Sequence, residues 1–348
     1  MIRKYFHILF FFALVALTGC YTDFEPDLKS TPVVCINSLI TAGDSIHVEV
    51  TRTWRYSEGD PLVKLDVMLR DAEVSLYVND RFEEQLVFTG RLNYFFNYEY
   101  YFAAKYIPKP GDRIKIHAVD KTYGEAEAEV TVPHPVEIDK LEARVTSNRT
   151  SYDEIYDTFN SEFEMTLNVT LTDPANETNA YIFEMPWYRS IVTEVEYDDG
   201  YTGQTYVESA SLFPDYSYEP IFSEHITPIE TVISNDTDIF SLFSDRQFSG
   251  KPYTLRIPIN GDYHCNYRVN PEHKHELTME VQLAHISTAY YNYMISWWAA
   301  NEGVHGILGD VGLGDPVFEH SNVSTGAGVV AARAISTAHL NIYNLLSE

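Results

Sequence analysis

The sequence predicts a mainly β protein, in which an N-terminal immunoglobulin-like or transthyretin-like β-sandwich precedes a β-rich domain with one amphipathic helix. Two observations predict this fold class. Short segments in which apolar and polar residues alternate recur at close spacing along the chain, which is the pattern of sandwich strands. The composition is also rich in aromatic residues, with 26 Tyr and 19 Phe, and aromatic residues favour strands over helices.

The first half of the chain contains about seven such segments. Strands are expected at residues 33–39, 45–53, 73–78, 85–88, 94–102, 113–119 and 125–132. Asn79-Asp80 and Pro110-Gly111-Asp112 are typical turn sequences between them. Pro133-His134-Pro135 cannot continue a paired strand. We therefore place a boundary there, with an immunoglobulin-like sandwich over 33–133 and a second, β-rich domain over 136–348.

The second half is strand-rich but less regular. Strands are expected at 136–145, 163–171, 181–185, 253–259, 276–283 and 328–342. Asp198-Asp199-Gly200 predicts a hairpin between 193–197 and 201–207. Pro, Asp and Ser residues make 213–249 a long irregular segment.

A change of period marks the one predicted helix. Tyr290, Met294 and either Trp297 or Trp298 recur at helical spacing after a Ser287 or Thr288 cap. The pattern predicts an amphipathic helix over 287–301.

The N-terminus has the order of a secretory signal peptide. Arg3 and Lys4 precede an apolar run over 6–17, and Leu17-Thr18-Gly19-Cys20 closes it. These four residues resemble the lipobox of bacterial lipoproteins, in which the new N-terminal Cys carries fatty acyl chains such as palmitate. We therefore expect a signal peptide over 1–19, lipid on Cys20 and a tether over 20–32. Two or more acyl chains suffice for stable membrane anchoring. The alternative is an ordinary secreted protein with a cysteine at its cleavage site.

The charge of the chain excludes one large class of partners. Asp and Glu number 51 against 24 Lys and Arg, which gives a formal net charge of −27. Nucleic acid needs basic partners for its phosphates, so no nucleic-acid binding is expected. Docking on anionic lipid is disfavoured for the same reason. An acidic, solvated surface fits a protein held on a cell exterior by its lipid.

No catalytic motif is recognisable in the sequence. It has no His-Glu-x-x-His zinc helix, no Gly-x-Ser-x-Gly elbow and no P-loop. We expect no catalytic residues and no cofactor, and hence a non-enzymatic protein. The best metal candidate is His264 and Cys265 with His273 and His275, but its charged surroundings are typical of an exposed loop, and we predict no metal site. Cys35 and Cys265 could form a disulfide, although two separate thiols are favoured.

Two aromatic segments could form binding surfaces. Alternate residues of 94–102 are all aromatic, and this face is either an exposed platform or, as we favour, part of the core. Tyr216, Tyr218 and Phe222 lie in the irregular segment beside Pro214 and Pro220 and are expected to be exposed. We predict that these three rings, together with the Gly-rich segment 303–314, bind a protein partner.

The order of several short motifs resembles a known family. These motifs are Leu171-Thr172-Asp173-Pro174, Phe243-Ser244-Asp245, Phe248-Ser249-Gly250-Lys251, Tyr290-Tyr291-Asn292-Tyr293, Asp315-Pro316-Val317, Ser321-Asn322-Val323 and Gly326-Ala327-Gly328. With the lipobox, their order is similar to that of the Bacteroidetes outer-membrane lipoproteins grouped as domain of unknown function 4249. That resemblance implies a genomic setting like that of the accessory lipoproteins of TonB-dependent transporters, and it implies no catalytic residues.

These observations lead to one expected function and one alternative. We expect a surface lipoprotein of the outer membrane, facing the cell exterior, that assists a TonB-dependent transporter in nutrient capture. The alternative is a structural or adhesive envelope lipoprotein without a transport role. A hydrolase with an unrecognised site is a distant third. The identity of the ligand does not follow from the sequence.

Overall fold

The computed structural model describes residues 31–54, 64–92, 98–175, 177–196, 202–224, 241–267, 274–301, 303 and 317–347. Contacts within the chain separate Met1–Pro32 from a compact unit over Val33–Glu348, and the following description concerns that unit. The described residues are mainly β, with 59% of them in strands and 12% helical, which confirms the predicted fold class. The predicted signal peptide and Cys20 lie outside the described residues.

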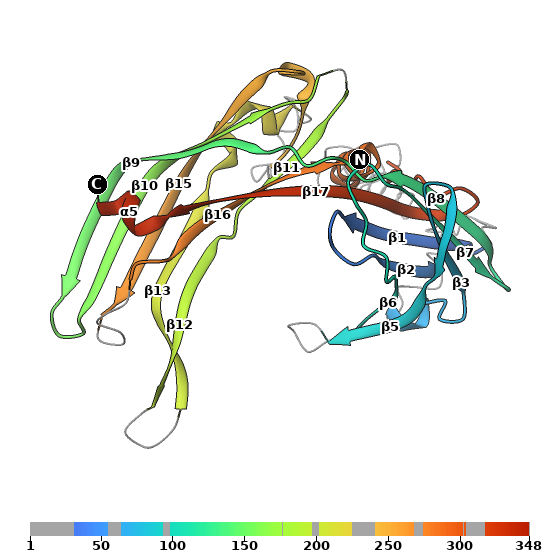
Figure 1. The fold of residues 1–348 in the computed structure, drawn as a ribbon, viewed down its shortest axis with the longest axis horizontal. Coiled ribbons are helices and arrows are strands. Elements are labelled where there is room, and N and C mark those ends of the chain that lie inside the picture. Colours follow the sequence, from blue (N-terminus) through green and yellow to red (C-terminus); the bar gives the residue numbers. More distant parts are fainter. Residues whose placement is uncertain are drawn as a thin grey trace, which may run out of the picture. The chain divides into compact units, whose positions relative to one another are not determined.

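Among the described residues of its first hundred positions, the unit has eight strands (Figure 1). They are β1 (Val34–Thr41), β2 (His47–Arg52), β3 (Glu73–Val78), β4 (Arg81–Gln85), β5 (Val87–Leu92), β6 (Tyr98–Ala103), β7 (Arg113–Asp120) and β8 (Gly124–Thr131). The predicted turns occur where expected. Asn79 and Asp80 both have positive φ, 51° and 66°, between β3 and β4, as a two-residue hairpin turn requires.

These strands build a sandwich around one apolar core. The four-stranded sheet β4-β3-β7-β8 packs against β1, β2 and β6. The alternate residues that enter this core include Val34, Ile36, Val48, Val74, Leu76, Ile114 and Ile116. The aromatic face of 94–102 reaches the core only at its end, because Phe102 is buried while Tyr98 is 64% exposed. Residues 93–97 lie outside the described residues.

Several strands of the second half are longer than the sequence predicts. They are β9 (Ile138–Asp153), β10 (Thr158–Thr172), β11 (Ala180–Glu184), β12 (Tyr188–Glu196), β13 (Thr202–Pro214), β14 (Leu242–Ser244), β15 (Pro252–Asn266), β16 (Thr278–Ile286) and β17 (Ala327–Asn341). Five of them form a sheet in the order β12-β13-β15-β10-β9. The predicted hairpin is present, since Glu196 pairs with Thr202 across β12 and β13.

One sheet extends through both halves. Its order is β14-β11-β16-β17-β1-β2-β6-β5, and β17 pairs in parallel with β1 and antiparallel with β16. Figure 1 shows β17 as the long strand that runs from the N-terminal strands to β16. Val330 and Ala332 of β17 belong to the sandwich core, whereas Ala338 and Leu340 pack against the second core. The boundary predicted at residues 133–135 stays a prediction, and β17 is the element that connects the two sides.

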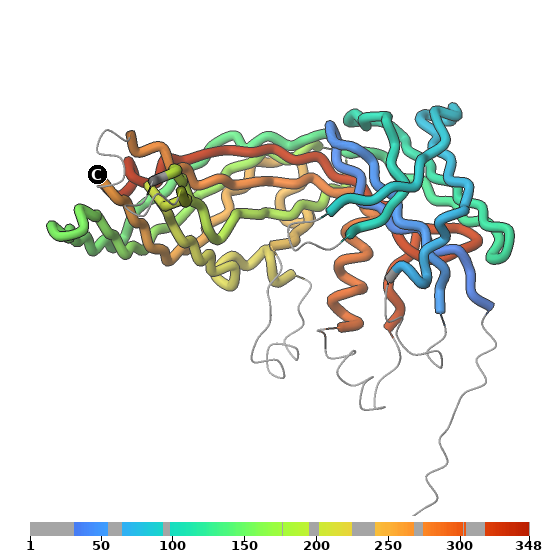
Figure 2. Tube along the Cα trace, turned by 90° about the horizontal axis from the view of Figure 1, so that it is seen from below, coloured from blue at the N-terminus to red at the C-terminus, as the bar shows by residue number. Residues whose placement is uncertain are grey.

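The predicted helix is α3 (Thr288–Asn301), which Figure 2 shows in orange, extending away from the layer of strands. Ser287 caps it, because its Oγ accepts the N–H of Tyr290 at 3.3 Å. Tyr290, Tyr291, Met294 and Ile295 pack on a third small core, and Trp298 is buried. A second helix, α5 (Ile342–Ser347), was not predicted. Within the described ranges, no helix has the length and apolar character to cross a membrane.

Candidate binding groove

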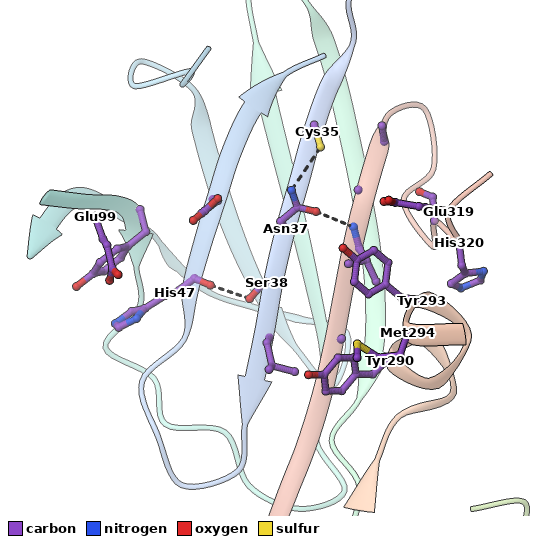
Figure 3. A pocket seen from close by; sticks show the side chains of 18 of the residues that line it. Cys35, Asn37, Ser38, His47, Glu99, Tyr290, Tyr293, Met294, Glu319 and His320 are labelled. Carbon is purple, nitrogen blue, oxygen red and sulfur yellow. Dashed lines mark hydrogen bonds between the residues drawn. The ribbon is translucent and has the colours of Figure 1, made fainter. Parts of the chain in front are cut away.

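A groove of about 850 Å³ lies on the face of β1 and β17 that is turned away from the sandwich core (Figure 3). Alternation along β1 creates its floor. Val34 and Ile36 enter the core, so Cys35, Asn37 and Leu39 point to the opposite face. The volume is within the range of ligand sites, roughly 300–1,000 Å³.

Small residues of β17 make room for the groove. Ala327, Val329 and Ala331 lie opposite Cys35, Asn37 and Leu39 in the parallel register. Gly328 has φ +102°, and a Cβ there would collide with the carbonyl oxygen of Ile36, so this position requires glycine.

Asn37 holds the floor together from the groove side. Its Oδ1 accepts the N–H of Val329 at 3.1 Å, and its Nδ2 donates to Cys35 Sγ at 3.6 Å. Figure 3 shows both bonds: the one to Val329 joins β1 to β17, and the one to Cys35 lies within β1. The Asn37 side-chain amide thus helps to fix the register of β1 against β17, and it also lies at the surface of the groove.

Helix α3 forms one wall. Tyr290, Tyr293 and Met294 face the groove beside Glu319 and His320 (Figure 3). Ser296 Oγ accepts the N–H of His320 at 2.7 Å, which ties the 317–321 segment to the helix. Burial raises the pKa of the Tyr293 hydroxyl, and the nearby Glu319 and Cys35 raise it further, so Tyr293 is a neutral donor at neutral pH.

The far end of the groove is formed by β2, β5 and β6. His47 stacks on Tyr101 with ring centroids 4.0 Å apart. Arg91 Nε contacts Glu99 Oε2 at 3.0 Å. Burial, followed by the charge of Arg91, lowers the pKa of His47, so this imidazole is uncharged at neutral pH.

The composition of the lining determines which ligands it suits. Three carboxylates, Glu49, Glu99 and Glu319, face one guanidinium, Arg91, which is already paired with Glu99. An anionic ligand is therefore disfavoured. The rings of Tyr101, Tyr290 and Tyr293 offer apolar faces with hydroxyl groups at their edges. This combination suits a polar molecule, neutral or cationic, that has an apolar side.

The structure corrects the predicted aromatic partner surface. Phe222 is fully buried, and Tyr216 packs against the same core, with its ring centroid 5.5 Å from that of Phe222. Burial raises the pKa of Tyr216 to about 12. Only Tyr218, 70% exposed, is at the surface. The expectation of three exposed rings was wrong, because two 3₁₀ turns over 216–223 fold the segment back onto the core. Of the predicted Gly-rich segment 303–314, residues 304–314 lie outside the described residues.

The cysteines and histidines singled out in the sequence separate into different places. Cys35 and Cys265 are both free, which confirms the prediction of separate thiols. His264 Nδ1 bonds Asn160 Oδ1 at 2.8 Å, whereas His275 lies beside Glu208 and Cys265. His273 is outside the described residues. Neither the role of Glu208 nor the groove could be predicted from the sequence, because both depend on contacts between strands that are distant in the sequence.

The family model described as Domain of unknown function (DUF4249) matches residues 21–338 of the chain. This match covers most of the chain, so the chain belongs to that family. No curated protein gives a significant match.

Proposed function

We propose that this member of the DUF4249 family is a non-enzymatic, lipid-anchored lipoprotein of the outer membrane that helps a TonB-dependent transporter to capture a nutrient. The observation that carries the proposal is the groove on β1 and β17. It is large enough for a small molecule, and its lining combines aromatic faces with several hydrogen-bonding groups.

The N-terminal sequence supports the place of action. The signal-like segment ends in Leu17-Thr18-Gly19-Cys20, and acyl chains on Cys20 would hold the protein at the membrane. In this proposal the protein lies on the outer face of the outer membrane, where nutrients arrive. The net charge of −27 opposes capture of nucleic acid.

The nutrient that fits the groove is a neutral or cationic polar molecule with an apolar side. The excess of carboxylates over guanidinium groups in the lining supports this choice. Tyr101, Tyr290 and Tyr293 would cover the apolar side, and Asn37 and the carboxylates would form hydrogen bonds with the polar side.

Co-purification from native membranes tests the role in transport. A tagged chain is isolated from gently solubilised outer membranes, and its partners are identified by mass spectrometry. We expect a TonB-dependent barrel in near-stoichiometric amount, and we expect Cys20→Ala to release the chain from the membrane fraction. Recovery of other surface proteins without a barrel would instead support an adhesive envelope protein and contradict the transport role.

A further inference from the structure

A second cluster of chemically active side chains lies among β13, β15 and the start of β16, and none of its members lines the groove. Glu208, Cys265 and His275 offer one oxygen, one sulfur and one nitrogen, and these atoms all lie within 4.8 Å of one another. Glu208 and Cys265 are fully buried, while the His275 side chain is 20% exposed. The histidine therefore connects a buried pair to solvent.

The strand register brings the first two groups together. Glu208 of β13 pairs directly with Cys265 of β15, so their side chains leave the sheet on the same face. His275 comes from the segment that leads into β16. Its ring stacks on Tyr343 of α5 with centroids 3.5 Å apart and planes within 10°. This stacking fixes the ring while its Nδ1 points at Glu208.

Four donors surround the buried carboxylate. Glu208 Oε2 accepts the backbone N–H groups of Glu276 at 3.1 Å and Leu277 at 2.7 Å. Its Oε1 accepts from the Tyr263 hydroxyl at 2.7 Å and from His275 Nδ1 at 2.9 Å. A purely structural interpretation is that this carboxylate anchors the start of β16. That interpretation accounts for Oε2. The Cys265 sulfur has hydrogen-bond contacts with Tyr263 and Tyr267, and it also lies within 4.8 Å of the ligand atoms of Glu208 and His275.

We propose that Glu208 Oε1, Cys265 Sγ and His275 Nδ1 form a Zn²⁺ site. Carboxylate, thiolate and imidazole are the ligands that zinc takes in proteins, and three of them leave a fourth position for water or the Tyr263 hydroxyl. Tetrahedral bonds of about 2.0–2.3 Å require donor atoms roughly 3.3–3.7 Å apart. A pair at the upper limit of 4.8 Å reaches that spacing by closing by about 1 Å, whereas Glu208 Oε1 and His275 Nδ1, at 2.9 Å, move apart by roughly 0.5 Å.

Charge and protons balance for this binding. The ion replaces the thiol proton of Cys265, which leaves to solvent, so one proton is released per Zn²⁺. His275 stays neutral, but its single proton moves from Nδ1 to Nε2, where the Tyr267 hydroxyl oxygen lies 3.3 Å away and can accept it. One carboxylate, one thiolate and one Zn²⁺ sum to zero, which suits a buried site. The two backbone hydrogen bonds to Glu208 Oε2 would hold the carboxylate so that its other oxygen, Oε1, points at the ion.

Cobalt titration tests the site, with Co²⁺ as a spectroscopic substitute for Zn²⁺. The full chain carries Cys20→Ser, so that this residue contributes no thiolate, and is freed of metal with a chelator. We expect one equivalent of Co²⁺ to produce a near-ultraviolet thiolate-to-cobalt charge-transfer band, and an equivalent of Zn²⁺ to remove it. Zn²⁺ should also raise the thermal midpoint of this protein.

Matched variants separate the proposed ligands from their neighbours. Cys265→Ser should abolish the band, and Glu208→Gln should weaken metal affinity at least about tenfold. Cys35→Ser and His264→Ala should leave both the band and the affinity unchanged. Circular dichroism of each metal-free variant checks that it is folded, and Cys265→Ala replaces the serine variant if that protein unfolds. A missing band in the parent chain, or a band that survives in a folded Cys265 variant, would overturn the proposal.

Discussion

Replacing Phe222 by alanine should destabilise the protein strongly, although Phe222 lies in a segment with the composition of an exposed loop. Its ring is fully buried and packs edge-to-face with Tyr216 and Phe243, at centroid distances of 5.5 and 5.6 Å. A phenylalanine side chain buries at least about 150 Å², which at ~25 cal/mol/Å² corresponds to about 4 kcal/mol. Measured Phe→Ala substitutions in cores cost ~3–5 kcal/mol.

Thermal unfolding followed by circular dichroism measures this loss. The compact unit over Val33–Glu348 has roughly 300 residues, so its entropy of unfolding is about 0.6 kcal/mol/K at ~2.1 cal/mol/K per residue. A loss of about 4 kcal/mol then lowers the midpoint by about 6 °C. The matched control is Tyr218→Ala, because Tyr218 is 70% exposed and should change stability by less than ~0.5 kcal/mol. Equal midpoints for the two variants would refute the assignment of Phe222 to the core.

Three further predictions concern Gly328, the contribution of β17 to the sandwich, and the pH dependence of stability. Gly328→Ala should destabilise more than Gly43→Ala in thermal unfolding; both glycines have positive φ, but only at Gly328 would a Cβ meet a neighbouring strand. Residues 33–133 expressed alone lack β17, so joining 327–341 to them through a linker should raise their unfolding midpoint, and no rise would count against the shared-strand architecture. Burial lowers the pKa of His285 below 6.5, despite its hydrogen bond to a backbone carbonyl. The stability that neutral His285 contributes is therefore fully present above about pH 6.5 and is lost as the pH falls through the lower folded pKa, and His285→Gln should reduce the difference in midpoint between pH 7.5 and pH 5.

Local alternation was enough to predict most strands. The predicted segment 73–78 coincides with β3, and 328–342 nearly coincides with β17. The pairing partner of β17 could not be predicted, because Cys35 and Ala327 lie at opposite ends of the sequence and meet only in the sheet. No local pattern records such a long-range parallel pairing.

Backbone signals and side-chain burial also carry different information. Pro220 correctly predicts irregular backbone, whereas Pro214 is the last residue of strand β13. Irregular backbone does not imply exposure, because Phe222 is buried in its 3₁₀ turn. The groove could not be predicted from the sequence either, because its lining residues are brought together only by the fold. Asn37, Tyr101 and Tyr293 come from three distant segments, and each one alone is an ordinary strand or helix residue.

Native mass spectrometry of the protein purified from cells tests the central claim, that the groove holds a nutrient. Leu39→Trp fills the floor of the groove from a residue that is 39% exposed, and Val192→Trp is the matched control at a strand position 44% exposed that does not line it. The account predicts a bound neutral or cationic small molecule in the parent protein and in Val192→Trp, and its loss in Leu39→Trp. A molecule retained equally by Leu39→Trp, or no bound molecule in the parent protein, would contradict it.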